Sequence, residues 1–148
     1  MPALCTIGYQ QASLSGFLVA LRAACVKVVL DVRDVPNSRR PEFRKRALGR
    51  ALGEAGISYL HLAGLGNPPS GRNAARAARI QDYHAIYLAR LADDVGQRHL
   101  ARATAVAGSA RSCLLCYEAD WHHCHRSLVA PRIAGALGLA IVHLTVGG

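Results

Sequence analysis

The sequence predicts an α/β fold: an open, mostly parallel five-stranded sheet with helices on both faces, the three-layer sandwich of Rossmann-like domains. Two observations predict it. Short apolar runs rich in β-branched residues alternate along the chain with stretches whose apolar residues recur at helical spacing. The connections between the apolar runs are long enough to hold a helix, which is what a right-handed crossover between parallel strands requires.

The first half of the chain is expected to hold three strands and two helices. Strands are predicted at 5–7, 27–32 and 57–62, where the apolar runs lie. The first helix follows Ser13, because a serine hydroxyl can accept a hydrogen bond from the first turn of a helix. The second helix is predicted over 42–54, after a loop rich in proline and asparagine.

The middle of the chain is expected to be a long loop followed by helices. Residues 64–71 are rich in Gly, Pro and Asn without periodicity, and they suit a lid or a rim. From 73 to 98, apolar residues keep a helical spacing that Gly96 is predicted to interrupt. A further alanine-rich helix is expected over 97–107.

The last part of the chain is expected to complete the sheet. Residues 112–117 predict an apolar strand, 124–137 a helix and 139–144 a closing strand. Pro131 is unfavourable inside a helix, because it lacks an N–H and clashes with the preceding turn. Two alternatives follow: the helix bends at Pro131, or a short turn precedes a helix that starts there.

Length and composition predict one soluble domain over residues 1–148. The chain is 51% hydrophobic, and no apolar run is long enough for a membrane span. Five cysteines without regular spacing fit a reducing compartment, so we expect a cytoplasmic protein. The formal charge of +9 predicts an anionic partner, either a small molecule or a nucleic acid, and no membrane.

Polar side chains follow several predicted strands at the point where each strand ends. Tyr9 follows the first strand, Asp31 and Arg33 end the second, and Cys116 and Glu118 end the fourth. The carboxyl ends of parallel strands meet at one edge of the sheet, where ligands bind. We therefore expect these side chains to lie close together around a crevice.

A second thiol stands where the last helix could begin. Cys124 is followed by His125 and Arg126, and a helix N-terminus, a fixed positive charge and a base all favour a thiolate. This pattern predicts Cys124 as a nucleophile or redox thiol, with Glu118 or His125 transferring the proton. The alternative is that Cys124 is a small buried residue whose neighbours cap the helix.

The same cysteines allow a metal site. Cys113 and Cys116 resemble half of a zinc motif, but their odd spacing in a strand directs them to opposite faces. Cys116, Cys124 and His125 can instead form an open three-ligand set. No cofactor is otherwise expected.

Several short motifs occur in order along the chain: Thr6-Ile7-Gly8, Asp31-Val32-Arg33 with Pro36 and Ser38, Phe43, Gly56-Ile57-Ser58-Tyr59, Leu65-Gly66, Cys116-x-Glu118 and Cys124-His125-Arg126. With these motifs the chain resembles domain-of-unknown-function family 488 (DUF488) over Thr6 to about Leu137. The resemblance implies a compact α/β domain with its polar residues at one end of the sheet, and it implies no reaction. Two residues depart from the pattern: Tyr9 replaces a common histidine, and Asn67 replaces a glycine.

The leading hypothesis is a cysteine-dependent hydrolase or transferase, or a binding domain, for an anionic ligand that carries phosphate. Arg33, Arg126 and the loop 38–40, which includes Ser38 and Arg39, are expected to hold the anion. The rival hypothesis is a nucleic-acid-binding module that uses the arginines of 39–50 and of 72–79. The candidate ligand-binding residues are Thr6, Tyr9, Asp31, Arg33, Ser38, Arg39, Cys116 and Arg126.

Overall fold

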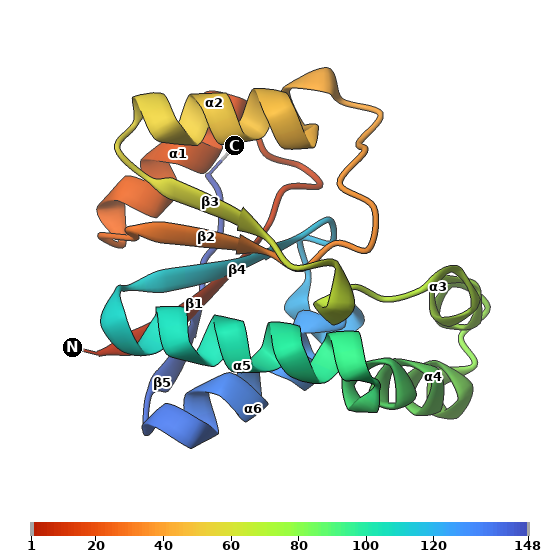
Figure 1. Cartoon of the computed structure of the whole chain (residues 1–148). Coiled ribbons are helices and arrows are strands. Elements are labelled where there is room, and N and C mark those ends of the chain that lie inside the picture. Colours follow the sequence, from red (N-terminus) through yellow and green to blue (C-terminus); the bar gives the residue numbers. More distant parts are fainter. Residues whose placement is uncertain (1, 148) are drawn as a thin grey trace.

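The computed structural model describes residues 2–147 and contains a five-stranded, all-parallel sheet (Figure 1). The strands lie in the order β3-β2-β4-β1-β5, so β4 occupies its centre between β2 and β1. The α/β fold with a parallel sheet is therefore confirmed. The strands are β1 (Ala3–Gly8), β2 (Val28–Asp31), β3 (Ser58–His61), β4 (Ser112–Cys116) and β5 (Ala140–His143).

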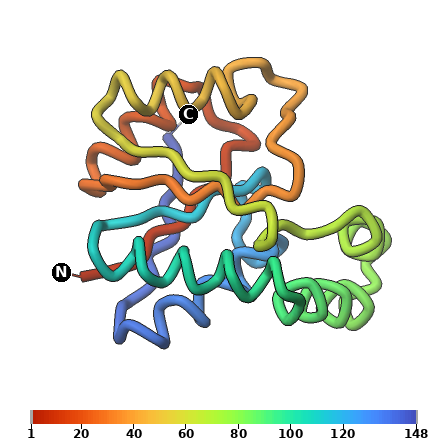
Figure 2. The backbone as a smooth tube through the Cα atoms, in the orientation of Figure 1, coloured from red at the N-terminus to blue at the C-terminus, as the bar shows by residue number. Residues whose placement is uncertain are grey.

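Helices cover both faces of the sheet, as Figures 1 and 2 show. On one face lie α1 (Leu14–Ala23) and α2 (Lys45–Glu54), and on the other lie α5 (Asp94–Ser109) and α6 (Arg126–Leu137). None of the helices within residues 2–147 is long and apolar enough to cross a membrane. The two remaining helices, α3 (Pro69–Arg76) and α4 (Ile80–Ala92), pack on each other beyond the carboxyl ends of the strands.

The central strands are buried along their whole length because helices cover both of their faces. Successive side chains of β4 alternate between the two layers: Cys113 and Leu115 pack with α1 and α2, whereas Leu114 and Cys116 pack with the opposite layer. The expectation that Cys113 and Cys116 face apart is therefore confirmed. Cys116 ends β4 on the side where α6 begins.

Helix starts follow local capping chemistry in two places. The Ser13 hydroxyl accepts a hydrogen bond from the Gly16 N–H at 3.0 Å, which confirms it as the cap of α1. The predicted helix 42–54 begins later than expected, because Arg44 is extended (ψ 150°) and separates a 3-10 turn at Pro41–Phe43 from α2.

The prediction of one helix over 73–98 is wrong. Ala78 adopts a left-handed conformation (φ 59°) that ends one helix, and the Asp93 carboxylate caps the start of another by accepting from Gly96 N–H at 2.7 Å. Gly96 therefore lies in the first turn of α5 instead of at a break. It has to be glycine there, because a Cβ atom would lie 2.2 Å from the Arg90 carbonyl oxygen.

Two further boundaries differ from expectation. The predicted loop 64–71 is partly helical: α3 starts at Pro69, whose fixed φ suits the first turn of a helix. The last helix starts at Arg126 instead of Cys124, and it runs through Pro131 to Leu137. The alternative in which that helix begins at Pro131 is therefore excluded.

Gly8 allows the loop after β4 to lie directly against the end of β1. The Gln10 N–H donates to the Tyr117 carbonyl at 2.9 Å, which extends the pairing of the two strands into their loops. A Cβ atom on Gly8 would lie 1.7 Å from the Glu118 carbonyl oxygen, and the obstacle is backbone. The position of Glu118 therefore depends on a glycine at residue 8.

We expect Gly8→Ala to lower the free energy of unfolding by at least roughly 1–3 kcal/mol, the usual range for overpacking of a close contact. Gly53→Ala is the control, because Gly53 lies in a helix and a Cβ atom added to it would meet no packing neighbour within 4 Å. That change should be neutral or should stabilise by up to about 1 kcal/mol. Urea denaturation of both variants measures this, and equal effects would contradict the proposed close approach.

Candidate functional site

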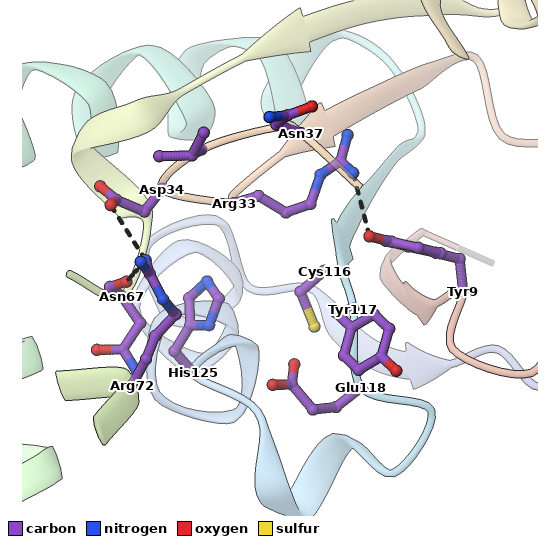
Figure 3. A pocket seen from close by; sticks show the side chains of 11 residues that line it. Tyr9, Arg33, Asp34, Asn37, Asn67, Arg72, Cys116, Tyr117, Glu118 and His125 are labelled. Carbon is purple, nitrogen blue, oxygen red and sulfur yellow. Dashed lines mark hydrogen bonds and ion pairs between the residues drawn. The ribbon is translucent and has the colours of Figure 1, made fainter. Parts of the chain in front are cut away.

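A hollow of about 280 Å³ lies at the carboxyl ends of β1, β2 and β4 (Figure 3). A smaller hollow of about 190 Å³ adjoins it and shares part of its wall. The position agrees with the rule that ligands bind at the carboxyl edge of a parallel sheet. The larger hollow is lined by Tyr9, Arg33, Asp34, Val35, Asn37, Asn67, Arg72, Cys116, Tyr117, Glu118 and His125.

One wall is built on a buried ion pair at the end of β2. The Arg33 guanidinium donates to both carboxylate oxygens of Asp31, at 2.9 and 2.7 Å, and the Tyr59 hydroxyl donates to the same carboxylate at 2.5 Å. Burial opposes the charged form, but the bonds to Asp31 raise the pKa of Arg33 overall. Arg33 therefore presents a fixed positive charge to the hollow, whereas Asp31 is enclosed behind it.

A second cluster of charge forms the rim. The Asp34 carboxylate accepts from Arg90 at 2.7 Å and from Arg72 at 3.1 Å, so two guanidinium groups share one carboxylate. Arg72 also donates to the Asn67 carbonyl at 2.8 Å. The rim therefore carries a net positive charge.

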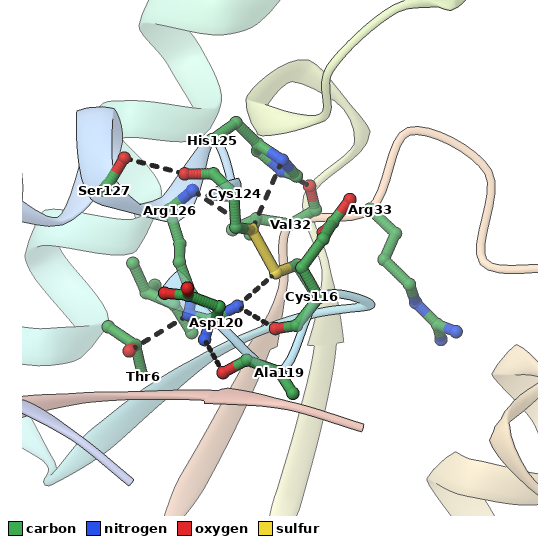
Figure 4. The surroundings of a disulfide bond; sticks show 12 residues. Thr6, Val32, Arg33, Cys116, Ala119, Asp120, Cys124, His125, Arg126 and Ser127 are labelled. Carbon is green, nitrogen blue, oxygen red and sulfur yellow. Dashed lines mark hydrogen bonds between the residues drawn. A yellow bond between two sulfur atoms is a disulfide. The ribbon is translucent and has the colours of Figure 1, made fainter. Parts of the chain in front are cut away.

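The sulfur atoms of Cys116 and Cys124 meet beside the hollow, where the structure joins them in a disulfide (Figure 4). Cys124 lies between the 3-10 turn Trp121–His123 and α6, and its sulfur accepts from the Arg126 backbone N–H at 3.5 Å. Both cysteines are almost fully buried. Of the two, only Cys116 forms part of the wall of the hollow.

His125 is held in one tautomer by a backbone carbonyl. Its Nε2 lies 2.6 Å from the Val32 carbonyl oxygen, which accepts the proton that this nitrogen carries. In the neutral ring Nδ1 is then unprotonated, and it lies 3.7 Å from the sulfur of Cys124. Burial lowers the pKa of His125 to about 4, so the ring is neutral near pH 7.

The Arg126 side chain lies beneath the sulfur pair and is fully buried. Its guanidinium donates to the Cys116 sulfur and to the Glu118 carbonyl, both at 2.6 Å, and to the Thr6 hydroxyl at 3.1 Å. Within residues 2–147 it forms no ion pair with a carboxylate. Burial lowers the pKa of Arg126, because the charged form loses its contact with water.

Glu118 faces the hollow from the loop after β4, close to the sulfur of Cys116 (Figure 3). Burial raises the pKa of this carboxyl, although the backbone and Arg126 act in the opposite direction. Its carboxylate forms no ion pair in the part of the chain that the structure describes. Glu118 is thus a carboxyl group that can both donate and accept a proton at the hollow.

Several predicted ligand-binding residues lie outside the hollow. Thr6 is buried and bonds to Arg126 and His143. The Ser38 hydroxyl accepts from the Arg40 N–H at 3.0 Å, Arg39 is exposed, and neither residue lines the hollow. The Arg40 guanidinium is occupied by the carbonyls of Tyr9 and Ala12. The loop 38–40 therefore supports the wall instead of forming it.

The arginines of the nucleic-acid hypothesis lie in different parts of the structure. Arg39, Arg46 and Arg50 are exposed at or near α2, whereas Arg72 lines the hollow. Arg79 forms an exposed ion pair with Asp82 at 3.5 Å. Nucleic-acid binding stays a prediction.

Sequence reasoning missed six residues that line the hollow: Asp34, Val35, Asn37, Asn67, Arg72 and Tyr117. Asp34 and Tyr117 directly follow the predicted site residues Arg33 and Cys116, so extending each predicted strand end by one residue includes them. Asn67 comes from the loop that was expected to form a rim. The sequence does not predict that Arg72 lines the hollow, because the direction of its side chain depends on the residue at which α3 starts.

Comparison with known proteins identifies the family of the chain. The family model "Domain of unknown function DUF488" matches residues 13–133. The chain belongs to the DUF488 family. No curated protein and no solved structure matches the chain.

Several residues of the motifs that resemble the DUF488 pattern have clear structural roles. Gly8 allows the loop that holds Glu118 to lie against the end of β1. Gly66 allows the loop after β3 to approach Asp34, because a Cβ atom added to Gly66 would lie 2.3 Å from the Asp34 Cα. The pair of Asp31 and Arg33 forms the wall at β2. These residues therefore support the segments that form the walls of the hollow.

The neutral state of His125 predicts a loss of stability in acid. The pKa of His125 is about 4 in the folded chain and 6.5 ordinarily. Between pH 6.5 and 4 the unfolded chain therefore binds a proton at this residue, whereas the folded chain does not. Stability should fall as the pH drops from 6.5 towards 4, by up to about 3 kcal/mol from this residue. Urea denaturation at about pH 7 and at about pH 5 measures the change.

The variant His125→Gln should show a weaker dependence on pH, whatever its stability at pH 7. His99 and His143, whose pKa values are also lowered by burial, retain part of the acid sensitivity. His84→Gln, outside the hollow, is the matched control and should keep the full dependence. An unchanged dependence in His125→Gln would contradict a neutral, buried imidazole.

Proposed function

We propose that this DUF488 domain is a cysteine-dependent hydrolase or transferase that acts on a small anionic ligand, with phosphate-bearing molecules as the favoured class. The observation that carries the proposal is the sulfur of Cys116, which lies on the wall of the hollow and in contact with the Arg126 guanidinium. A guanidinium beside a thiol favours the thiolate, which is the nucleophilic form.

The charge around the hollow supports an anionic ligand. Arg33 and Arg72 line it, Arg90 shares the Asp34 carboxylate with Arg72, and Arg126 lies behind the Cys116 sulfur. The three carboxyl groups nearby, Asp31, Asp34 and Glu118, offset only part of the charge of these four arginines. Guanidinium groups bind phosphate and carboxylate through paired N–H donors. A volume of about 280 Å³ suits a small molecule rather than a duplex.

The chemistry would begin with attack by the Cys116 thiolate on an electrophilic carbon or phosphorus of the ligand. A bond forms from sulfur to that atom, and the leaving group departs with its electron pair and takes the proton of Glu118. Water or a second acceptor then takes the group from sulfur, and its proton returns to Glu118. Sequence reasoning favoured Cys124 as the nucleophile, but Cys116 is the cysteine that lines the hollow.

Cys124 and His125 have a supporting role in this proposal. The Nδ1 atom of His125 lies 3.7 Å from the Cys124 sulfur. With a small external disulfide as the oxidant, the Cys124 thiolate attacks one of its sulfur atoms and releases one thiol, and Cys116 then attacks Cys124 and releases the second, which closes the disulfide between Cys116 and Cys124. In the disulfide the Cys116 sulfur is not a thiolate and cannot act as the nucleophile. Activity should therefore require a reductant.

The test is alkylation of the reduced protein by iodoacetamide at neutral pH in the presence of a chelator, with each cysteine followed by mass spectrometry. Cys116 should react about tenfold faster than Cys25, an exposed cysteine far from the hollow that serves as an internal reference. Inorganic phosphate or pyrophosphate should slow the reaction at Cys116 and leave Cys25 unchanged. In the oxidised protein only Cys25 should react readily.

Two arginine variants test the anion site. Arg72→Gln should weaken the protection by phosphate about tenfold, because it removes one charge from the hollow. Arg46→Gln, on the exposed face of α2, should leave the protection unchanged. If Cys116 reacts no faster than Cys25 and phosphate has no effect, the proposal is wrong.

A further inference from the structure

We infer that the reduced sulfur pair, together with Glu118 and His125, is a binding site for one thiophilic divalent ion, with Zn²⁺ as the natural occupant. This site goes beyond the proposed function, because a bound ion would coordinate the same sulfur atoms and prevent Cys116 from attacking a ligand. The metal and the disulfide are then alternative states of one pair.

Three ligand atoms are already close together. The sulfur atoms of Cys116 and Cys124 and a carboxylate oxygen of Glu118 all lie within 4.8 Å of one another. Thiolate sulfur and carboxylate oxygen are both common zinc ligands, at about 2.3 Å and about 2.1 Å. The Cα atoms of the two cysteines are 7.4 Å apart, wider than the 5.5–6 Å or so that is usual for a disulfide, so the reduced sulfurs have room to separate around an ion.

His125 lies next to these three atoms but outside the group that is within 4.8 Å, so its ring has to move towards the ion to become the fourth ligand. Its Nε2–H donates a hydrogen bond to the Val32 carbonyl oxygen. A histidine that binds a metal through one ring nitrogen commonly donates the N–H of the other nitrogen to such an oxygen. The Nδ1 atom lies 3.7 Å from the Cys124 sulfur. Ligands at bond lengths of 2.1–2.3 Å around a tetrahedral ion are separated by about 3.6 Å, so this distance fits one edge of the tetrahedron.

The buried Arg126 balances the charge of such a site. Two thiolates and one carboxylate carry three negative charges, so a divalent ion among them leaves a net charge of about −1. Arg126 is fully buried, contacts the Cys116 sulfur at 2.6 Å and has no carboxylate partner within residues 2–147. A metal-loaded cluster would supply the counter-charge that this guanidinium needs.

The test uses Co²⁺ and Zn²⁺ alone, added to the full chain after reduction with a phosphine and removal of resident metal. Co²⁺ should bind at one ion per chain and give the near-ultraviolet band of thiolate-to-cobalt charge transfer, with visible bands of tetrahedral cobalt. One equivalent of Zn²⁺ should remove these bands. The oxidised protein should bind neither ion, which provides a control without mutation.

Variants assign the ligands. Cys116→Ser and Cys124→Ser should each weaken Co²⁺ binding at least about 100-fold, and Glu118→Gln and His125→Gln about 10- to 100-fold. Cys25→Ser, which removes an exposed cysteine elsewhere, should bind as the wild type does. Circular dichroism establishes that each variant is folded.

The inference is overturned if the reduced, folded wild-type chain gives no charge-transfer band, or if the band survives in both Cys116→Ser and Cys124→Ser. It is equally overturned if Cys25→Ser abolishes the band. The alkylation experiment is carried out in the presence of a chelator, so a negative result there contradicts the proposed function and not the metal site. A negative cobalt result contradicts the metal site and not the reactivity of the Cys116 thiol.

Discussion

The site depends on the buried guanidinium of Arg126, which lies where β1, β4 and α6 converge and has no carboxylate partner among residues 2–147. Arg126 bonds to Thr6 in β1, to the Cys116 sulfur at the end of β4, and to the carbonyls of Glu118 and Ala119 in the following loop. Burying such a charge is costly unless its donors are satisfied and a negative charge lies near. The groups that satisfy it are the same ones that form the candidate site.

This constraint relates the structure of the hollow to its chemistry. The Arg126 charge favours an anionic Cys116 sulfur, whether it is a free thiolate or part of a metal cluster, and Gly8 allows the Glu118 loop to reach it. The disulfide removes the negative sulfur and leaves the guanidinium with neutral acceptors. The oxidation state of two cysteines therefore changes the electrostatics of the whole pocket.

The strands and the edge of the sheet that carries the site were predictable because they follow from local patterns. Apolar runs marked the strands, Ser13 marked a helix start, and the strand-end rule selected Arg33, Cys116 and Glu118. The division of 73–98 was not predictable, because the apolar stripe continues across Ala78 and only a left-handed residue ends the helix. Arg72 and the supporting role of Ser38 depend on contacts between distant segments, which spacing alone does not reveal.

The most direct measurement of the central claim is the far-ultraviolet absorbance of thiolate in the reduced, metal-free protein at neutral pH. The account predicts a thiolate signal in the wild type that persists in Cys25→Ser and disappears in Cys116→Ser, because Arg126 stabilises that sulfur. If the reduced wild-type protein shows no thiolate absorbance at neutral pH, or if the signal is unchanged in Cys116→Ser, the buried guanidinium does not organise the site as described.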